Sequence, residues 1–271
     1  MPINTQHNAA AVASANRLGK TRALLQSTVG RVASGSRINE SAADTAGSAV
    51  SVNLNSQASS TLVAIRNARD GQSMIQTSEA ALNEVANMVD RMRELAVQSS
   101  SGILEDGERA YASAEFVKLV DEVKRMSQNG KFNGQSVVQG KSYEVQVGTQ
   151  DSPAHRISIT TADVKTLWTG LSVVSIADAS DARTGIGRID TTLDRLNTQR
   201  SKLGALHNRL DNAISNAQSY HETLRAASSR IQDADMANET AKMTALQVRQ
   251  QAGIAALSQA KQLPATVVEL I

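Results

Sequence analysis

The residues of this chain that could carry chemistry are few, and they form no complete catalytic motif. Residues 221–225 read His-Glu-Thr-Leu-Arg and begin like the HExxH motif of zinc proteases, but an arginine stands where the second histidine must be. His207 and His221 are 14 residues apart on one predicted helix and could not bind one metal ion. Gly185 and Gly187 lack the further residues of a nucleotide-binding loop. The sequence therefore predicts a protein that is not an enzyme and uses no metal or cofactor.

The composition excludes further classes of site and favours long helices. The chain of 271 residues has no cysteine, which excludes disulfides, thiolate catalysis and cysteine-ligated metals. It has 28 Lys and Arg against 26 Asp and Glu, which argues against nucleic acid as a partner, although residues 1–36 contain basic residues and no acid. Aromatic residues make up 2% of the chain and prolines number 3, so we expect long, thin helices in place of a compact core.

Nothing in the sequence predicts a membrane segment or a cleaved leader. No run of 18 or more apolar residues is present, so we expect no membrane insertion. Residues 1–8 carry no basic residue and no apolar segment follows them, so we expect no cleaved signal peptide. These features indicate a protein that stays in the cytoplasm or leaves the cell without cleavage.

The strongest pattern is an apolar stripe with alternating steps of three and four residues between positions 186 and 231. This spacing is typical of a coiled coil, and at about 1.5 Å per residue the helix would be about 70 Å long. We expect the helical stretch 41–100 to pack beside it in the antiparallel direction. The predicted seam positions are Ile186, Ile189, Leu193, Leu196, Arg200, Leu203, His207, Leu210, Ile214, Ala217, His221, Leu224, Ser228 and Ile231.

Both ends of the chain are predicted helices with few charges and a narrow apolar stripe. The helix in residues 236–271 is expected to run through Leu263, where Pro264 stops or kinks it. A pair of such helices buries little surface, so we expect the ends to fold on association with other copies. If that contact is head-to-tail and does not close, it builds a helical filament. The stripe in residues 1–36 is formed by Ala11, Ala15, Leu18, Leu25, Val29 and Val32.

The predicted fold is mainly α: a long antiparallel coiled-coil rod with a small β-hairpin region and terminal helices that pair on polymerisation. Residues 1–36 and 236–271 are expected to form an inner terminal-helix domain, and residues 37–235 the rod domain. Strands are predicted only within about residues 137–180. The strand signals are the alternating residues Tyr143, Val145 and Val147, the pair Ile157 and Ile159, and the β-rich run 171–176.

Several motifs occur in a fixed order at both ends of the chain. The densest is Arg-Met-Arg-Glu-Leu-Ala-Val-Gln-Ser at residues 91–99. The others lie at residues 31–39, 66–71, 132–134, 147–148, 203–210, 229–235, 250–254 and 260–264. Together they resemble bacterial flagellin, the subunit of the flagellar filament. The middle of the chain is short, so the outer domains of larger flagellins are expected to be absent.

The resemblance implies a structural subunit that self-assembles into a hollow helical polymer for motility and is located in the extracellular filament. The implied partners are other copies of the chain, the flagellar type III export apparatus, a secretion chaperone, and the filament cap and hook junction proteins. The alternative is a hook–filament junction protein, which shares the end motifs but caps the structure. The match at residues 91–99 favours flagellin.

The resemblance also implies two sets of contact residues. Arg91, Leu95 and Glu115 match positions that pack subunits together and that a vertebrate Toll-like receptor contacts on the flagellins it detects. Asp90 replaces a glutamine common in detected flagellins, which weakens the receptor match. The residues expected to pack in the inner terminal helices are Leu18, Leu25, Val32, Gln250, Gln251, Gly253, Ile254 and Leu257.

Overall fold

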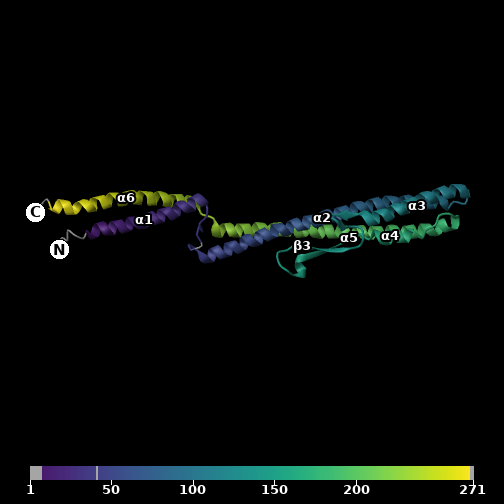
Figure 1. Cartoon of the computed structure of the whole chain (residues 1–271), viewed down its shortest axis with the longest axis horizontal. Coiled ribbons are helices and arrows are strands. Elements are labelled where there is room, and N and C mark those ends of the chain that lie inside the picture. The colour runs from purple at the N-terminus through teal and green to yellow at the C-terminus, as the bar shows by residue number, and fades with distance from the viewer. Residues whose placement is uncertain (1–7, 41, 269–271) are drawn as a thin grey trace. The chain divides into compact units, whose positions relative to one another are not determined.

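The computed structural model describes residues 8–40 and 42–268, with side chains as far as residue 262, and it is mainly helical (Figure 1). The prediction of a mainly α chain with a small antiparallel β region is confirmed. None of the helices in this described part is long and apolar enough to cross a membrane. The helices are α1 (Ala9–Ser34), α2 (Thr45–Ser99), α3 (Asp106–Asn129), α4 (Val164–Leu171), α5 (Ala179–Gln232) and α6 (Met236–Val268), with a short 3-10 helix at Pro153–His155. The strands are β1 (Lys131–Phe132), β2 (Gln135–Ser136), β3 (Ser142–Gln146) and β4 (Arg156–Thr160).

The chain folds as two compact units, which we call the terminal unit and the rod unit. The terminal unit contains Met1–Ser56 and Thr223–Ile271, and the rod unit contains Gln57–Glu222. The division falls within α2 and within α5, so each of these helices has residues in both units. The sequence places the division elsewhere, at residues 36 and 236.

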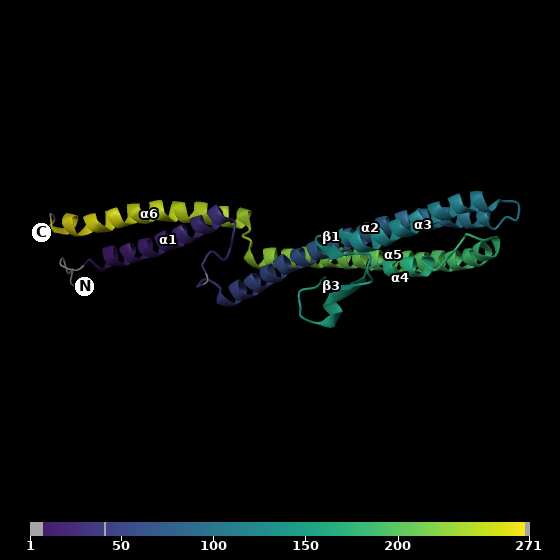
Figure 2. The same cartoon turned by 45° about the vertical axis from the view of Figure 1, so that its right-hand side comes forward.

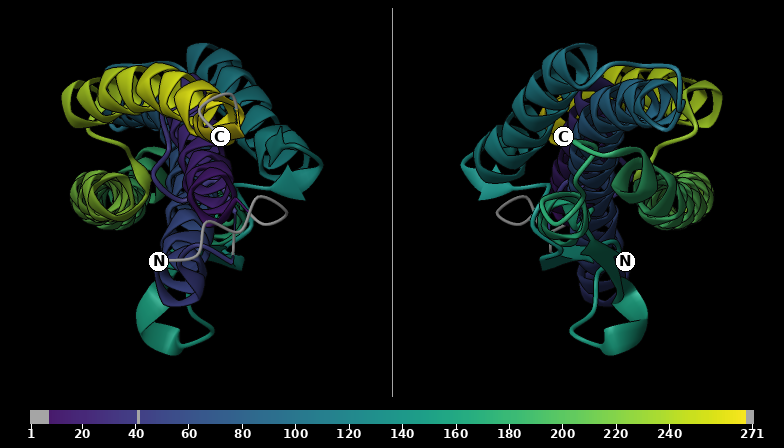
Figure 3. Two further views of the ribbon diagram at one scale, coloured as in Figure 1. Left: turned by 90° about the vertical axis from the view of Figure 1, so that its left-hand side faces the viewer. Right: turned by 90° about the vertical axis from the view of Figure 1, so that its right-hand side faces the viewer.

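In the rod unit, α3 and α5 both run antiparallel to α2 and in the same direction as each other (Figures 1 and 2). Figure 3 looks along the helices and shows α3 and α5 on different sides of α2. Apolar residues at steps of three and four meet between these helices and exclude water almost completely. The fully buried side chains include Leu82 and Met92 of α2, Phe116 of α3, and Ile189, Leu196, Leu203 and Leu210 of α5.

A buried arginine closes the turn between α2 and α3. Both terminal nitrogens of Arg109 donate to main-chain oxygens: Nη1 to Ser99 and to Ser101 (3.2 Å), and Nη2 to Leu104 (2.7 Å). The last carbonyls of a helix have no partner within the helix. Arg109 supplies a partner for the last carbonyl of α2, at Ser99, and for two carbonyls of the turn, so it fixes the point at which the chain reverses.

The predicted α5 seam is wrong at Arg200, which is exposed. The positions 189, 196, 203 and 210 are buried as the pattern predicts, whereas Leu193 and His207 are only half-buried. The neighbouring residues Thr192 and Gln199 are turned inward, because α5 packs against α4 and the β region as well as against α2. Because α4 and the β region pack on α5 in addition to α2, residues 192 and 199 face inward where the pattern predicts residues 193 and 200.

Near the end of α5 the stripe continues into the terminal unit. Ile214 is buried near the end of the rod unit, and in the terminal unit Leu224 is buried and Ile231 is half-buried. Ser228 of the predicted seam is also buried, and its hydroxyl donates to the side-chain oxygen of Asn55 on α2 (3.1 Å).

The β region consists of two hairpins. Strands β1 and β2 are joined at Asn133 and Gly134, which both have positive φ, as a tight hairpin turn requires. Strands β3 and β4 pair antiparallel from Ser142↔Thr160 to Gln146↔Arg156. Their hairpin projects from the helices in Figure 2. The first hairpin lies before residue 137, outside the segment in which strands are predicted.

The predicted strand at residues 171–176 is wrong. Leu171 ends α4, and no strand follows it among these residues. Asp163 begins α4 by accepting a hydrogen bond from the main-chain nitrogen of Thr166 (3.2 Å), and Val164, Leu167 and Leu171 are buried at helical spacing. A short apolar run is ambiguous in sequence, and here the helix cap decides it.

Polar residues on the long helices hold the β region in place. Ser78 of α2 is buried, and its hydroxyl donates to the carbonyl of Val137 (2.7 Å) and accepts from the main chain of Ala162 (3.4 Å). Gln199 of α5 accepts from the Asp163 nitrogen (2.8 Å) and donates to the Asp163 carbonyl (3.3 Å). These side chains provide hydrogen-bond partners for backbone groups at the ends of the β region, which have no backbone partner there.

Gly71 of α2 allows the hairpin to lie close to the helix. A Cβ at this position would come within 3.0 Å of Ile159 Cδ1 and 3.3 Å of Val145 Cγ2. Gly71 therefore marks the place where the β3–β4 hairpin packs on α2.

In the terminal unit, α1 and α6 lie side by side and antiparallel (Figure 1). The first helix ends at Ser34, and Gly35 caps it with a positive φ of 67°. The last helix continues to Val268, so Pro264 does not stop it, and the other expected outcome, a kink at Pro264, stays a prediction.

We expect Leu210→Ala to destabilise the rod unit by about 2–5 kcal/mol, because it removes a fully buried side chain from a narrow core that has little freedom to collapse. Thermal and denaturant unfolding of the purified chain measure this loss. Arg200→Ala, at an exposed position of the same helix, is the matched control and should change stability by less than about 0.5 kcal/mol. Equal effects of the two substitutions would show that the buried stripe is misplaced.

Candidate assembly surfaces

The terminal unit buries one stripe from each of its two long helices. On α1 the buried or half-buried positions follow steps of three and four through Leu18 and Thr28, and on α6 they run from Glu239 to Ala260. Gly253 permits close approach, since a Cβ there would lie 3.3 Å from Leu18 Cδ1. The side-chain amide of Asn8 donates to the Ala260 carbonyl (2.7 Å) and joins the start of α1 to α6.

The residues expected to pack in these helices separate into two groups. Leu18 is buried between α1 and α6, and Leu25, Val32, Gln250, Gly253 and Leu257 are half-buried there. The two others, Gln251 and Ile254, are exposed, and Ile254 keeps 47% of its surface in water. Within one chain they therefore pack against nothing that would bury them.

Ile254 belongs to a larger set of exposed apolar side chains on the terminal unit. Val12 is 61% exposed and Val248 is 60% exposed. These exposed apolar side chains on two thin helices make the terminal unit a candidate interaction site. The members of the set on α1 and α6 are Val12, Leu24, Val29, Met236, Val248 and Ile254, and α2 adds Val50 and Val52.

A small ionic cluster joins α1 to the start of α6. Glu239 is buried, and its two carboxylate oxygens accept hydrogen bonds from Lys242 Nζ (3.0 Å) and Arg31 Nε (3.0 Å). The hydrogen bond from Lys242, with that from Arg31 and the charges of both, lowers the pKa of Glu239 below its ordinary value against the opposing effect of burial. The charged carboxylate thus stabilises the pairing of α1 with α6.

The two ends of the chain meet in a joint formed by residues 35–37 and 231–234. The main-chain nitrogen of Arg37 donates to the carbonyl of Gln232 (2.7 Å), and the nitrogen of Ala234 donates to the carbonyl of Gly35 (2.9 Å). Ser36 Oγ also donates to the Gln232 carbonyl (3.0 Å). The motifs at residues 31–39 and 229–235, nearly 200 positions apart, are therefore hydrogen-bonded to one another.

The side chain of Gln232 ties the joint to α2. Its oxygen accepts hydrogen bonds from Ser51 Oγ (3.1 Å) and Asn55 Nδ2 (3.4 Å). Asp235 then begins α6 by accepting from the main-chain nitrogens of Ala237 (3.0 Å) and Asn238 (3.1 Å). Sequence reasoning missed Ser51 and Asn55, because no local pattern connects them with a residue about 180 positions later.

Three residues are predicted to form a surface on the rod unit. Arg91 and Glu115 do lie on it, whereas Leu95 does not. Arg91 of α2 binds Glu115 Oε1 of α3 (2.8 Å) and Glu94 Oε2 of its own helix (2.9 Å), and these groups are about half exposed. Leu95 is only 2% exposed and packs in the core, so it can support this surface but does not form part of it.

The histidines do not converge. His207 Nε2 lies 3.6 Å from Asp211 Oδ2 one turn along α5, and His221 is half-buried further along the same helix. No group of three or more His, Asp or Glu side chains that could hold a metal ion occurs among residues 8–40 and 42–268.

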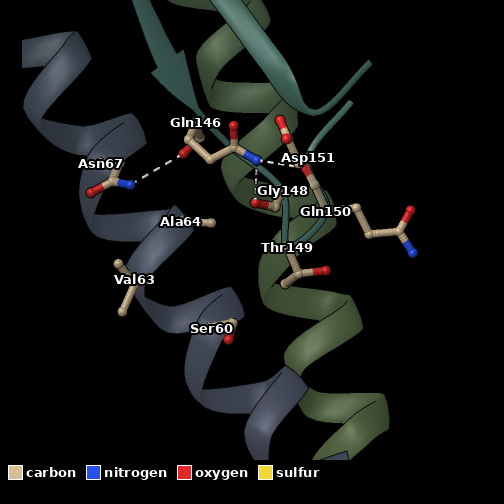
Figure 4. A pocket seen from close by; sticks show the side chains of 9 residues that line it. All are labelled: Ser60, Val63, Ala64, Asn67, Gln146, Gly148, Thr149, Gln150 and Asp151. Carbon is tan, nitrogen blue, oxygen red and sulfur yellow. Dashed lines mark hydrogen bonds between the residues drawn. The ribbon is translucent and has the colours of Figure 1, made fainter. Parts of the chain in front are cut away.

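Figure 4 shows a hollow of about 310 Å³ between α2 and the loop that joins β3 to β4. Asn67 Nδ2 donates to the Gln146 carbonyl (3.3 Å), and Gln146 Nε2 donates to the carbonyls of Gly148 (2.9 Å) and Gln150 (2.8 Å). Asp151 is the one ionisable residue in its lining, which includes the hydroxyls of Ser60 and Thr149 but no histidine, lysine or cysteine. These bonds hold the loop against α2.

Family models match both ends of the chain. Residues 3–142 match the bacterial flagellin N-terminal helical region, and residues 186–271 match the bacterial flagellin C-terminal helical region. A flagellin of Halalkalibacterium halodurans is 36% identical over 267 residues, which cover 98% of each chain.

Solved structures give the same relationship. The crystal structure of Bacillus cereus flagellin is similar with a TM-score of 0.51 at 30% identity, covering 56% of this chain and 88% of that one. A putative flagellar hook-associated protein of Vibrio parahaemolyticus is similar with a TM-score of 0.60 at 14% identity, covering 70% of this chain and all of that one. The second likeness shows a shared fold alone.

The ionic cluster at Glu239 makes the pairing of α1 and α6 sensitive to acid. Because the folded-state pKa is lowered, the stabilisation is fully present above the ordinary carboxyl pKa of about 4.3 and is lost as pH falls through the lower folded value. We therefore expect Glu239→Gln to destabilise the pair at pH 7 and to have little effect near pH 2. Thermal melting followed by circular dichroism at both pH values measures the difference.

The matched control for this prediction is Glu222→Gln, which changes an exposed carboxylate of α5. A Glu239→Gln effect of equal size at pH 7 and pH 2 would contradict the proposed role of its charge.

Proposed function

Because this chain belongs to the bacterial flagellin family, it is a structural subunit of the extracellular flagellar filament, and we propose that its terminal unit provides the main contact between subunits. The chain is not an enzyme, and it self-assembles into a polymer of flagellin copies. The observation that carries the proposal is the set of exposed apolar side chains on α1 and α6.

One chain by itself cannot bury all the apolar side chains of its two terminal helices. Each terminal helix packs one stripe on its partner and leaves Val12, Val248, Ile254 and their neighbours in water. Docking on other subunits removes these side chains from water, at about 25 cal/mol for each Å² of apolar surface buried. We propose that the ends become fully ordered only on docking, so that folding and polymerisation are coupled.

The rod unit has the complementary task of stiffness. Its three long helices share a continuous core, and Arg109 and the polar contacts of Ser78 and Gln199 fix the turns and hairpins to it. Small shifts between neighbouring rods would permit the filament to supercoil.

Further partners follow from membership of the family. We propose that the chain is exported unfolded and without cleavage through the flagellar type III apparatus, and that it meets a secretion chaperone, the filament cap and the hook junction proteins. The alternative of a hook–filament junction protein finds no support, since the hook-associated neighbour shares the fold alone.

We propose as a second role that the Arg91–Glu115 surface is contacted by a vertebrate Toll-like receptor. The supporting observation is that both side chains are accessible on adjacent helices and are held together by their ion pair. In reporter cells that carry the receptor, Arg91→Ala should weaken the response to monomeric protein, whereas the exposed control Arg69→Ala should not. Equal responses to the two variants would exclude this role for Arg91.

We expect a chain that lacks residues 236–271 to remain a soluble rod that cannot polymerise, because α1 loses its partner and the apolar face of α6 is absent. Electron microscopy of concentrated, seeded protein measures filament formation. Filaments of the shortened chain would show that the contact lies elsewhere.

A surface variant separates assembly from folding. Val248→Lys with Ile254→Lys places charge on the exposed face of α6 and should block polymerisation while leaving the melting temperature of the monomer unchanged. Gln247→Lys, at an exposed polar position of the same helix, is the matched control and should still polymerise.

A further inference from the structure

Two asparagines of the chain, Asn129 and Asn133, are followed directly by glycine. Asparagine is one of the chemically labile residues of proteins, because the main-chain nitrogen of the next residue can attack its side-chain amide carbon. Glycine has no Cβ, so the approach of its nitrogen is not hindered. The two pairs look alike in the sequence, and the structure distinguishes them.

The reaction needs water as its only co-reactant. The glycine nitrogen loses its proton and bonds to the asparagine Cγ, and the side-chain nitrogen leaves as ammonia, which closes a succinimide ring. Water then opens the ring at one of its two carbonyl carbons. Opening at Cγ gives aspartate with a normal backbone, and opening at the main-chain carbon gives isoaspartate, whose backbone runs through the side chain.

The surroundings of Asn129, the last residue of α3, oppose this reaction. Its side-chain nitrogen donates to the carbonyl of Arg125 (3.0 Å), and the attacking nitrogen of Gly130 donates to the carbonyl of Met126 (3.2 Å). Gly130 is also closely packed, since a Cβ there would lie 2.7 Å from Val138. Ring closure would break both hydrogen bonds and unwind the last turn of the helix.

Asn133 has none of these restraints. With Gly134 it forms the turn between β1 and β2, at φ values of 47° and 79°, and both residues are exposed. Within the described part of the chain, neither the Asn133 side chain nor the Gly134 nitrogen has a hydrogen-bond partner. A Cβ at Gly134 would meet nothing within 4 Å, so the turn has open space around it.

Ring closure at Asn133 requires a local opening of the turn, because the Gly134 nitrogen must rotate toward the side chain about the Asn133 Cα–C bond. The turn joins strands of two residues each, which pair at Lys131↔Ser136 and Phe132↔Gln135. So short a hairpin has little stability of its own, and its opening costs little free energy. The buried residues 136–138 follow the turn and can stay in place.

We propose that Asn133 is a site of spontaneous, irreversible modification, at which the folded chain converts asparagine into aspartate and isoaspartate and releases ammonia. The end of α3 protects Asn129 from the same reaction. This proposal concerns the covalent state of a single chain and does not depend on its assembly.

The isoaspartate product alters the hairpin as well as its charge. It adds one carbon atom to the backbone of a tight turn, which cannot keep the pairing of Phe132 with Gln135. Phe132 is half-buried and packs against the core of the rod unit. We therefore expect isoaspartate to displace Phe132 and to lower the melting temperature. Aspartate at position 133 keeps the normal backbone and tolerates a positive φ as asparagine does.

The test incubates the full chain in mildly alkaline buffer, both folded and unfolded in urea. Peptide mapping by mass spectrometry measures the deamidated fraction at each asparagine over time. In the folded chain we expect Asn133 to react at least about tenfold faster than Asn129, because less structure must open. In urea both restraints are lost, so the two rates should become similar. Equal rates in the folded chain, or a folded chain that reacts at neither position, would overturn the proposal.

Two variants complete the test. Asn133→Gln requires a larger ring that closes much more slowly, so it should abolish the reaction at position 133 and leave the rate at Asn129 unchanged. Asn133→Asp carries the charge of the products on a normal backbone and should melt as the unaltered chain does. The deamidated fraction of aged protein, separated by ion exchange, should melt at a lower temperature than Asn133→Asp. Equal melting of these two proteins would overturn the expected displacement of Phe132.

Discussion

The structure depends on one constraint: each long helix can bury only a narrow stripe of its surface against its partners. In the rod unit, three helices and the β region surround that stripe, and side chains such as Leu196 and Leu210 are fully buried. In the terminal unit only α1 and α6 pack together, and apolar residues remain in water on both. The two units thus differ in the number of their packing partners and not in the presence of exposed apolar side chains, since Ile103 and Tyr111 of the rod unit are exposed as well.

The joint formed by residues 35–37 and 231–234 follows from this constraint together with the order of the helices along the chain. Antiparallel pairing of α2 with α5 brings the segment after α1 beside the segment before α6, so backbone groups of Gly35 and Arg37 bind those of Ala234 and Gln232. The hydrogen bonds of Gln232 to Ser51 and Asn55 then connect this joint with α2. Two motifs that look unrelated in the sequence are in this way two halves of one structural element.

The sequence predicts the buried stripe of α5 well, but it is wrong for α1 at Ala15 and Val29, which are exposed, and it predicts the neighbours of each stripe poorly. The seven-residue spacing of Ile189, Leu196, Leu203 and Leu210 is enough to identify the buried face of α5, because only a helix places those residues together. The inward turn of Gln199 in place of Arg200 depends on the capping residue of α4, which no local pattern reveals. Likewise, Gln251 and Ile254 belong to family motifs, but their exposure depends on how α6 is rotated against α1.

The continuity of α2 and α5 has a mechanical consequence. Each of these helices has residues in both units, so the units are connected by two helical segments. A flexible linker would allow local rotation about single bonds, whereas a helical connection carries its backbone hydrogen bonds across the division.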